Sequence, residues 1–142
     1  MSFVLKIKRL NEEAKIPSYA YPMDAGVDLC ASEEVAFEVG QYGAVPTGLA
    51  FEIPEGYVGL VWDKSGLSIN KGLKTLAGVI DAGYRGEVKV GMINLGKEPQ
   101  VFKKGEKVAQ MLIQKIEQPA IQVVEVLSET HRGEKGFGSS GK

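Results

Sequence analysis

The sequence predicts an all-β protein, a β-sandwich or a β-barrel, built around one hydrophobic core. Segments with strand-like alternation recur about every eight to twelve residues, and glycine-rich turns separate them. Helical periodicity is almost absent. The chain of 142 residues is long enough for one domain and too short for two. With 44% hydrophobic and 25% charged residues, its composition is that of an ordinary soluble globular protein.

The first expected strands lie near the N-terminus. Residues 3–9 alternate apolar and charged side chains, which is typical of a half-exposed strand. Residues 24–31 follow a loop with two prolines and carry two carboxylates, Asp24 and Asp28, which are four residues apart and therefore on one face of a strand. We expect Asp24 to be an exposed loop or turn residue and Cys30 to lie in the core.

The rest of the chain continues the β pattern with one interruption. Residues 57–62 form an unbroken apolar run, which predicts a strand buried on both faces, with Trp62 packed inside. Residues 63–72 are the only stretch in which we expect a short helix. The other expected strands cover residues 35–39, 44–53, 73–80, 88–95, 108–116 and 121–127, the last of which closes the core.

Residues 78–87, Gly-Val-Ile-Asp-Ala-Gly-Tyr-Arg-Gly-Glu, form the stretch around which the chain is organised. Asp81 begins a tight turn that Gly83 permits, because glycine adopts a positive φ without steric cost. A turn alone does not require the Tyr84 and Arg85 that come next. The stretch is therefore either a structural β-hairpin whose tip carries polar side chains or a hairpin that carries reacting groups.

Two other stretches carry groups suited to binding a phosphate. A strand leads into Lys64, Ser65 and Gly66, so exposed backbone N–H groups lie beside a lysine and a hydroxyl, as in phosphate-binding loops. The C-terminal residues 128–142 are rich in glycine and carry an arginine, an aromatic ring and hydroxyl groups. Such an arm can fold over a phosphate and a planar ring, and a disordered terminus is the alternative.

Charge and cysteine content exclude several classes of function. With 17 Lys plus Arg against 18 Asp plus Glu, the net charge of −1 gives no bias toward nucleic acid, so a bound anion needs a local site. One cysteine excludes an internal disulfide framework and a cysteine-based zinc cluster, and it fits a reducing cytoplasm. No apolar run approaches the roughly 18 residues of a membrane span, and the N-terminus lacks a signal-peptide core, so we expect a cytoplasmic protein.

Five short segments, in this order along the chain, resemble the five motifs of the trimeric dUTPase family. They are residues 25–29, 63–67, 78–87, 105–111 and 132–139. Together they extend from about residue 24 to the C-terminus. The resemblance implies hydrolysis of dUTP to dUMP and pyrophosphate, which keeps uracil out of DNA and supplies dUMP for thymidylate synthesis.

The resemblance also implies an architecture and a set of partners. Residues 1–127 are expected to form a jelly-roll-like β-barrel domain, and residues 128–142 a flexible arm that closes the active site. The family forms homotrimers in which subunits share active sites, so the arm would close a neighbour's pocket. The expected cofactor is Mg2+ and the expected substrate is dUTP, with neither nucleic acid nor a membrane as partner.

Each matched residue takes an expected role from the resemblance. Asp81 is the catalytic carboxylate, which orients and deprotonates the attacking water. Tyr84 lies against the deoxyribose and leaves no room for a 2′-hydroxyl. Asp28 holds waters of a Mg2+ ion that bridges the triphosphate. The other expected substrate contacts are made by Lys64, Ser65, Gly66, Gly78, Gln110, Arg132, Phe137, Gly138 and Ser139.

These contacts divide between phosphate and base. Main-chain groups of residues 75–78 read the edge of uracil, and Phe137 covers the base. Two positions depart from the family pattern. Lys64 stands where arginine is usual, which removes a planar two-pronged donor but keeps the charge, and Lys135 stands where glycine is frequent. Phosphate oxygens are the expected partners of Ser65, Gly66, Gln110, Arg132 and Ser139.

Two other functions fit parts of the pattern. A dCTP deaminase, a relative with a similar fold, is disfavoured because Asp81 and Tyr84 lie in a hydrolase-type motif. A nucleotide-sensing module would use the same pocket to bind dUTP and change its partner surface. His131 is expected to be a solvated side chain, and Arg85 either touches substrate or pairs with an acid across the trimer interface.

Overall fold

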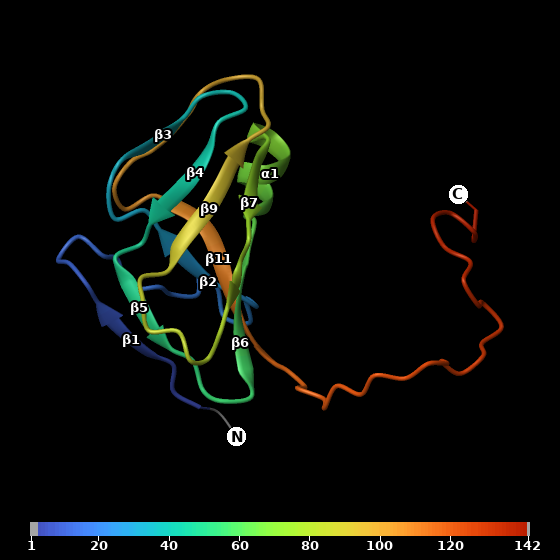
Figure 1. Cartoon of the computed structure of the whole chain (residues 1–142). Helices are drawn as coiled ribbons and strands as arrows, with labels where there is room; N and C mark the ends of the chain where they lie inside the picture. Colours follow the sequence, from blue (N-terminus) through green and yellow to red (C-terminus); the bar gives the residue numbers. More distant parts are fainter. Residues whose placement is uncertain (1–2, 142) are drawn as a thin grey trace.

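The computed structural model describes residues 3–141 and confirms the all-β prediction, with a short helix beside the strands (Figure 1). The helix, α1, spans Ser65–Lys71. The strands are β1 (Lys6–Arg9), β2 (Val27–Cys30), β3 (Val35–Phe37), β4 (Tyr42–Pro46), β5 (Leu49–Glu52), β6 (Tyr57–Trp62), β7 (Leu73–Leu76), β8 (Val79–Ile80), β9 (Lys89–Asn94), β10 (Gln100–Phe102) and β11 (Lys107–Lys115). Over residues 3–141, no helix is long and apolar enough to cross a membrane.

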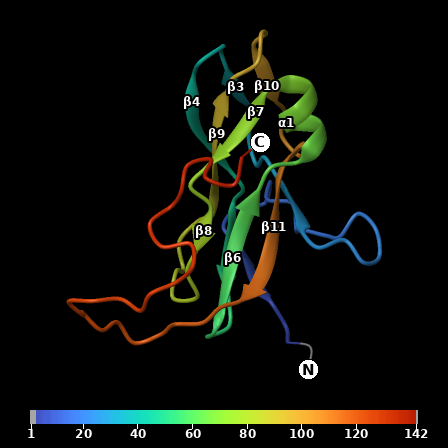
Figure 2. The ribbon, with the colours of Figure 1, turned by 90° about the vertical axis from the view of Figure 1, so that its right-hand side faces the viewer.

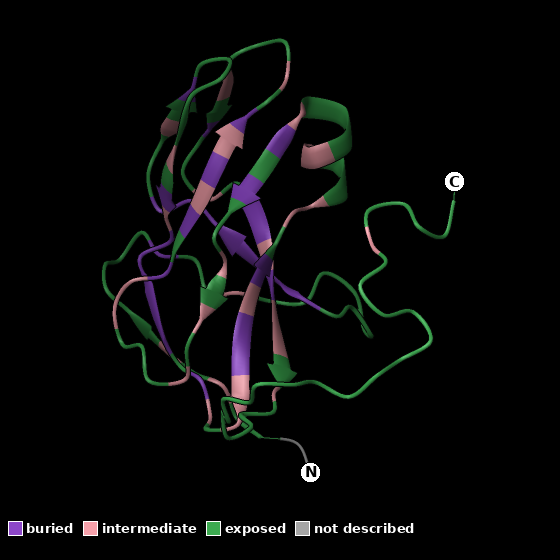
Figure 3. Cartoon of the chain, turned by 45° about the vertical axis from the view of Figure 1, so that its right-hand side comes forward, coloured by how far each residue is buried: buried purple, intermediate pink, exposed green. Residues whose placement is uncertain are grey.

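The strands pair antiparallel in small sheets that enclose one core. The largest sheet has the order β2-β11-β6-β8, and a second has the order β4-β9-β7. Strand β1 pairs with β5, and β10 pairs with β3. Figure 3 shows the buried residues in the strands of the body, whereas the C-terminal arm is mostly exposed. Each fully buried large apolar side chain contributes about 1.5–3 kcal/mol to stability. Such side chains include Leu29, Phe37, Phe51, Val90 and Met111.

Helix α1 confirms the expected short helix and has clear local causes. Lys64, the residue before it, is still extended with φ −89° and ψ 127°. Gly72 ends the helix with φ 70°, and its N–H donates to the carbonyl of Ser68. Glycine is required at this position because a Cβ atom there would lie 2.6 Å from Gly96 Cα.

The predicted closing strand at residues 121–127 is wrong. No strand follows β11 within the described residues, and Ile121 and Leu127 are 96% and 81% exposed. Strand β2 pairs with β11 only as far as Met111, and residues 121–127 do not return to the edge that is left beyond it. The segment instead leads away from the body of the protein into the arm (Figure 1).

Three other strand predictions change. The strand predicted at residues 73–80 is two strands, β7 and β8, because the chain turns at Ala77 and Gly78, which adopt φ 59° and 116°. Strand β6 is not buried on both faces, because Trp62 is 53% exposed. The strand predicted at residues 44–53 is two strands, β4 and β5, since Gly48 between them adopts φ 67°. Pro46 ends β4 at the edge of its sheet, where a missing backbone N–H is tolerated. The prediction that Cys30 lies in the core is confirmed.

Candidate active site

The buried carboxylate of Asp28 on β2 is the centre of one cluster of predicted site residues. Its Oδ1 accepts a hydrogen bond from Lys64 Nζ at 2.5 Å, and Lys107 Nζ lies 2.6 Å from its Oδ2. Burial, the largest single influence, raises the pKa of Asp28, but the interactions with Lys107 and Lys64 together lower it below the ordinary value of 3.8. Asp28 is therefore an ionised carboxylate between two lysines.

One oxygen of Asp28 keeps the capacity to accept a hydrogen bond. Among the described residues, Oδ2 is a buried oxygen without a well-directed donor, although Lys107 pairs with it by charge. Residues 3–141 contain no group of three His, Cys, Asp or Glu side chains able to hold a metal ion. A lone carboxylate with a free acceptor fits a hydrated Mg2+ held through water, because this ion dehydrates reluctantly.

Gln110 lies beside Asp28 in the same sheet. In the registers of β11 with β2 and β6, Gln110 is opposite both Asp28 and Trp62, so the three side chains share one face. Its Nε2 donates to the carbonyl of Asp63 at 2.9 Å. A Cβ atom at Gly26 would lie 2.9 Å from its Oε1, so the glycine of the first motif leaves room for this amide. The carboxamide is thereby held with a second N–H available.

The turn from β6 into α1 completes the cluster. Ser65 and Gly66 begin the helix and are exposed, and a Cβ atom at Gly66 would meet nothing within 4 Å. Lys64, one residue earlier, reaches Asp28. The structure therefore brings together five of the predicted residues, namely Asp28, Lys64, Ser65, Gly66 and Gln110. Two cations, backbone N–H groups and an amide at one place suit an anion with several oxygens.

Asp63 is a second partly buried carboxylate next to this cluster. Its Oδ1 accepts the N–H of Thr75 at 2.6 Å, and its Oδ2 accepts Lys74 Nζ at 2.6 Å. Burial is the largest influence and raises the pKa of Asp63, while the hydrogen bonds from Lys74 and Thr75 together lower it below 3.8. The carboxylate therefore ties the end of β6 to β7.

These lowered pKa values predict a loss of stability in acid. A carboxyl group with a lowered folded-state pKa stabilises the fold fully above its unfolded value of 3.8, and this stabilisation disappears as the pH falls through the lower folded value. We expect the thermal unfolding midpoint to fall below about pH 4, and less steeply in the Asp63→Asn variant, which has one carboxyl fewer to protonate. Unfolding scans from about pH 5 to about pH 2.5 test this, and equal slopes in both proteins would contradict it.

The loop of residues 81–88 between β8 and β9 carries Asp81 and Tyr84. The predicted β-hairpin here is wrong, because β8 pairs with β6 whereas β9 pairs with β4 and β7 in another sheet. Asp81 is exposed, and its carbonyl accepts the N–H of Tyr84 across the turn. The Tyr84 hydroxyl donates to the carbonyl of Glu87 at 2.9 Å, and Arg85 donates to the carbonyl of Ala82 at 2.7 Å. A Cβ atom at Gly86 would lie 2.6 Å from Tyr84 Cζ, so glycine is required for the ring to fold over the loop. Local bonds thus fix the tyrosine ring.

The turn between β7 and β8, where uracil recognition is expected, has an unusual backbone. Ala77 adopts φ 59°, which is uncommon for a residue with a Cβ, and Gly78 adopts φ 116°. A Cβ atom at Gly78 would lie 2.7 Å from the carbonyl oxygen of Val61. A cavity of about 160 Å3 lies beside this turn. Its lining includes Trp62, Lys74, Thr75, Ala77, Gly78 and Val79. This turn therefore presents its main chain beside a small hollow.

The two groups of residues lie apart within one chain. Gln110 pairs with Trp62 at one end of β6, whereas Ile80 pairs with Gly59, three residues along the strand. Three residues of a strand span about 10 Å, and Asp81 lies beyond that point. Figure 2 shows α1 beyond one end of β6 and the turn after β8 toward the other. One chain therefore does not bring Asp81 and Tyr84 to the residues around Asp28.

The predicted arm residues lie away from both groups. Phe137 is fully exposed with φ 50°, and Figure 1 shows the arm extending from the body of the protein. Arg132 donates from Nε to the carbonyl of Lys135 at 2.8 Å. Arg132 and Ser139 line the same hollow of the arm, so these two predicted phosphate contacts are brought together. Gly138 adopts φ 97° and turns the chain between Phe137 and Ser139.

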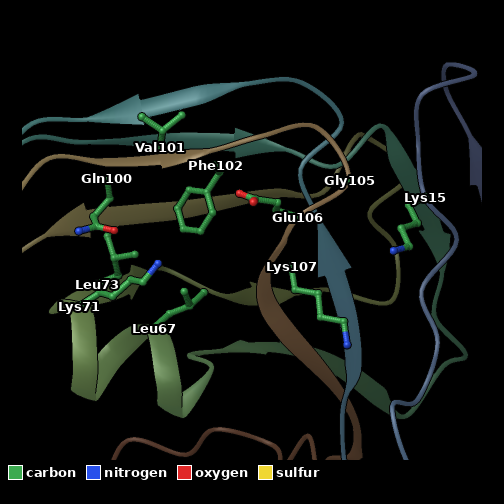
Figure 4. Close-up of a pocket in the computed structure, with 10 residues that line it drawn as sticks. All are labelled: Lys15, Leu67, Lys71, Leu73, Gln100, Val101, Phe102, Gly105, Glu106 and Lys107. Atoms are coloured by element: carbon green, nitrogen blue, oxygen red, sulfur yellow. The ribbon is translucent and has the colours of Figure 1, made fainter.

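A separate cavity of about 410 Å3 lies between α1 and the turn that joins β10 to β11 (Figure 4). Its apolar lining includes Leu67 and Phe102, and its lysines are Lys15, Lys71 and Lys107. Of the described residues that line it, none has a predicted role in the site. The predicted phosphate residues therefore lie outside this cavity, and Lys107 connects the two places.

Sequence reasoning missed three residues that shape these groups: Asp63, Gly86 and Lys107. Asp63 and Lys107 lie inside segments quoted for the second and fourth motifs, but a strand pattern does not show which side chains meet across strands. Gly86 is visible in the sequence, yet its need follows only from the position of the Tyr84 ring. The expected exposed position of Asp24 is confirmed, since its carboxylate accepts the N–H of Tyr21 in a turn.

Sequence comparison identifies relatives over nearly the whole chain. Residues 12–141 match the dUTPase family model. The deoxyuridine 5'-triphosphate nucleotidohydrolase of Clostridium kluyveri is 48% identical over 139 residues, which cover 96% of this chain and 97% of that protein. The corresponding protein of Rhodococcus erythropolis is 43% identical over 140 residues, which cover 96% of this chain and 85% of that protein.

Solved structures agree with this match. A mutant Staphylococcus bacteriophage 80alpha dUTPase with dUpNHpp has a TM-score of 0.94 and 32% identity, over 99% of this chain and 100% of that chain. A mutant dUTPase from phage phi11 of S. aureus, whose structure reveals the coordination of a structural Mg(II) ion, has a TM-score of 0.82 and 29% identity, over 87% and 98%. The family model and these relatives together show that this chain belongs to the dUTPase family.

Proposed function

We propose that this protein hydrolyses dUTP to dUMP and pyrophosphate with the help of Mg2+. The observation that carries the proposal is the cluster of Asp28, Lys64 and Gln110 beside the start of α1, in a chain of the dUTPase family. This cluster offers cations, amide donors and an ionised carboxylate, which are the groups that a metal-bound triphosphate requires. The expected assignments of Ser65 and Gly66 to phosphate oxygens fit their exposed backbone.

In the proposed mechanism, Asp81 holds a water molecule and accepts its proton as the water attacks the α-phosphorus in line. The bond from that phosphorus to the oxygen bridging the α- and β-phosphates breaks, and pyrophosphate leaves. A carboxylate suffices as base when it lies within hydrogen-bond reach of the water. Positioning and charge neutralisation provide most of the remaining acceleration in phosphoryl chemistry. Lys64 and Gln110 hold phosphate oxygens, and Asp28 would hold a bound Mg2+ through water. When bound, Mg2+ neutralises charge on the phosphate oxygens.

We further propose that a homotrimer assembles each site from several subunits. The separation of Asp81 from Gln110 along β6 supports this arrangement, because a complete site needs the Asp81 loop of one chain and the phosphate cluster of another. The arm of residues 128–142 then supplies Arg132 and Ser139 to the phosphates and Phe137 to the base. Sedimentation that gives a monomer at micromolar concentration would contradict the trimer.

Tyr84 is proposed to reject UTP by packing against the deoxyribose, and its ring is already fixed by the bond to Glu87 and by Gly86. Replacing Tyr84 by Ala opens the space for a 2′-hydroxyl. We expect the ratio of kcat/KM for dUTP to that for UTP to fall by about tenfold or more. Tyr84→Phe keeps the ring and serves as the matched control, with a ratio close to that of the wild type. An unchanged ratio in Tyr84→Ala would remove the steric role.

Pyrophosphate release from dUTP, UTP, dTTP and dCTP, measured in parallel with and without Mg2+, tests the proposed function. We expect release from dUTP that requires the metal. Ammonia release from dCTP would instead identify a deaminase. Binding of dUTP without release from any of the four nucleotides would indicate a sensor, and the hydrolase proposal would then be wrong.

A further inference from the structure

We propose that Asp63 is a positioning residue for the phosphate site, because its side chain fixes the peptide that orients the Gln110 amide. The inference rests on the proposed assignment of Gln110 to the triphosphate. Asp63 begins the segment 63–67, whose other polar members already have expected roles. It is therefore the member of this segment whose function is otherwise unassigned.

The carboxylate of Asp63 ties the end of β6 to β7. It stands at the end of β6, and both of its oxygens bind β7, through the N–H of Thr75 and the ammonium of Lys74, each at 2.6 Å. Its side chain is 19% exposed, so these bonds are only partly screened by water. Hydrogen bonds to an ionised acceptor are roughly twice as strong as neutral ones. The side chain thereby prevents rotation of the peptide that leads into α1.

The main-chain carbonyl of the same residue determines the direction of Gln110. It accepts Gln110 Nε2 at 2.9 Å, while the amide oxygen faces the open space that Gly26 leaves. The amide therefore has its nitrogen toward Asp63 and its oxygen toward Gly26. A phosphate oxygen requires a donor. We propose that the second N–H of Gln110 Nε2, which Asp63 does not accept, supplies it. If the Asp63 peptide turned, the amide would lose the partner that holds it this way.

Asp63 binds Gln110, a residue of the proposed phosphate site, and not a residue of the hydrophobic core. Gln110 is half-buried on the sheet face that also carries Asp28 and the exposed Trp62. Lys64, which reaches Asp28, continues from the peptide that Asp63 fixes. The effect of losing Asp63 should therefore fall on recognition of the triphosphate and not on recognition of the nucleoside, which we assign to residues 78–87.

Calorimetric binding of dUMP and of the analogue dUpNHpp with Mg2+ separates these effects. We expect Asp63→Ala to weaken dUpNHpp binding by about tenfold and dUMP binding by less than about twofold, because only the analogue carries the full triphosphate. Equal weakening of both ligands would indicate a general structural role and would overturn the proposal. Asp63→Asn keeps an acceptor for Thr75 N–H and is expected to bind the analogue within about threefold of the wild type.

Two further variants make the test specific. Lys74→Met removes the ion pair but leaves the bond from Thr75 N–H, so we expect near-normal binding of the analogue. If Asp63→Ala does not fold, Asp63→Glu keeps the charge but displaces the acceptor by one methylene group. It should show the same selective loss, and unchanged affinity would contradict the proposal.

A double-mutant cycle with Gln110→Ala separates failure of this inference from failure of the proposed site. We expect the combined variant to lose less affinity for dUpNHpp than the product of the two single losses, because both act through one amide. If Gln110→Ala has no effect, the assignment of Gln110 is wrong. If Gln110→Ala weakens binding while Asp63→Ala does not, or if the losses multiply fully, Asp63 does not position Gln110.

Discussion

Replacing Asp81 by Asn is expected to lower kcat for dUTP by about 10²–10⁴-fold while dUpNHpp still binds within a few-fold of the wild type. The amide has almost the same shape as the carboxylate but does not accept a proton from water. Asp81 is exposed at the end of β8 and its carbonyl, not its side chain, holds the turn to Tyr84, so the substitution leaves the turn intact. Initial rates of pyrophosphate release and calorimetric binding of the analogue check both parts.

The matched control is Glu98→Gln, which makes the same charge change at an exposed position in the loop between β9 and β10. We expect its kcat to equal that of the wild type. Loss of analogue binding in Asp81→Asn would mean that Asp81 binds substrate rather than activating water. A kcat that stays within about threefold would remove Asp81 from catalysis altogether.

Truncation before Arg132 is expected to lower kcat/KM for dUTP by about a hundredfold or more. The deletion removes a charge-assisted contact from Arg132 and the stacking of Phe137, each of which is worth about 1–3 kcal/mol. Because a loss of about 1.4 kcal/mol is a factor of ten in rate, the two contacts together account for this effect. Figure 1 shows the arm apart from the body of the protein, so the unfolding midpoint should not change.

Mixing experiments then test whether the arm and the Asp81 loop act in one site across subunits. Trimers that combine Asp81→Asn chains with truncated chains have some sites that receive an intact Asp81 from one subunit and an intact arm from another. We expect such mixtures to regain activity that neither parent has. Mixtures as inactive as their parents would place both groups in the site of a single chain. Removal of residues 140–142 alone serves as the control and should leave activity unchanged.

The fold class could be predicted from the sequence because strand alternation and turn residues are local properties. The helix was also predictable, since Gly72 supplies the positive φ that ends α1. The closing strand at residues 121–127 has the same local pattern and was nevertheless wrong. Whether such a segment pairs depends on where the chain carries it, and after β11 the chain leads away from the sheets. A strand pattern therefore predicts what a segment can form, and its neighbours decide what it forms.

In the candidate site, too, the sequence identified residues but not their contacts. Motif order gave the family and the identity of the expected residues, including Asp28, Gln110 and Asp81. It did not give the second lysine on Asp28, because Lys107 reaches that carboxylate from a neighbouring strand after a register shift in β11. Nor did it show that Gly86 is needed for the ring of Tyr84. Contacts between side chains distant in sequence depend on strand register, which alternation alone does not fix.

The sequence by itself determined that this is an all-β member of the dUTPase family with a short helix after β6. It could do so because hydrophobic alternation, glycine turns and short motifs are patterns of residues that are close together in the sequence. Only the tertiary structure decided that Asp28 lies between two lysines, that Asp63 holds the Gln110 amide, and that Asp81 stands at the other end of β6. These relations arise from the pairing of distant strands, because each pairing fixes which side chains face each other across the sheet.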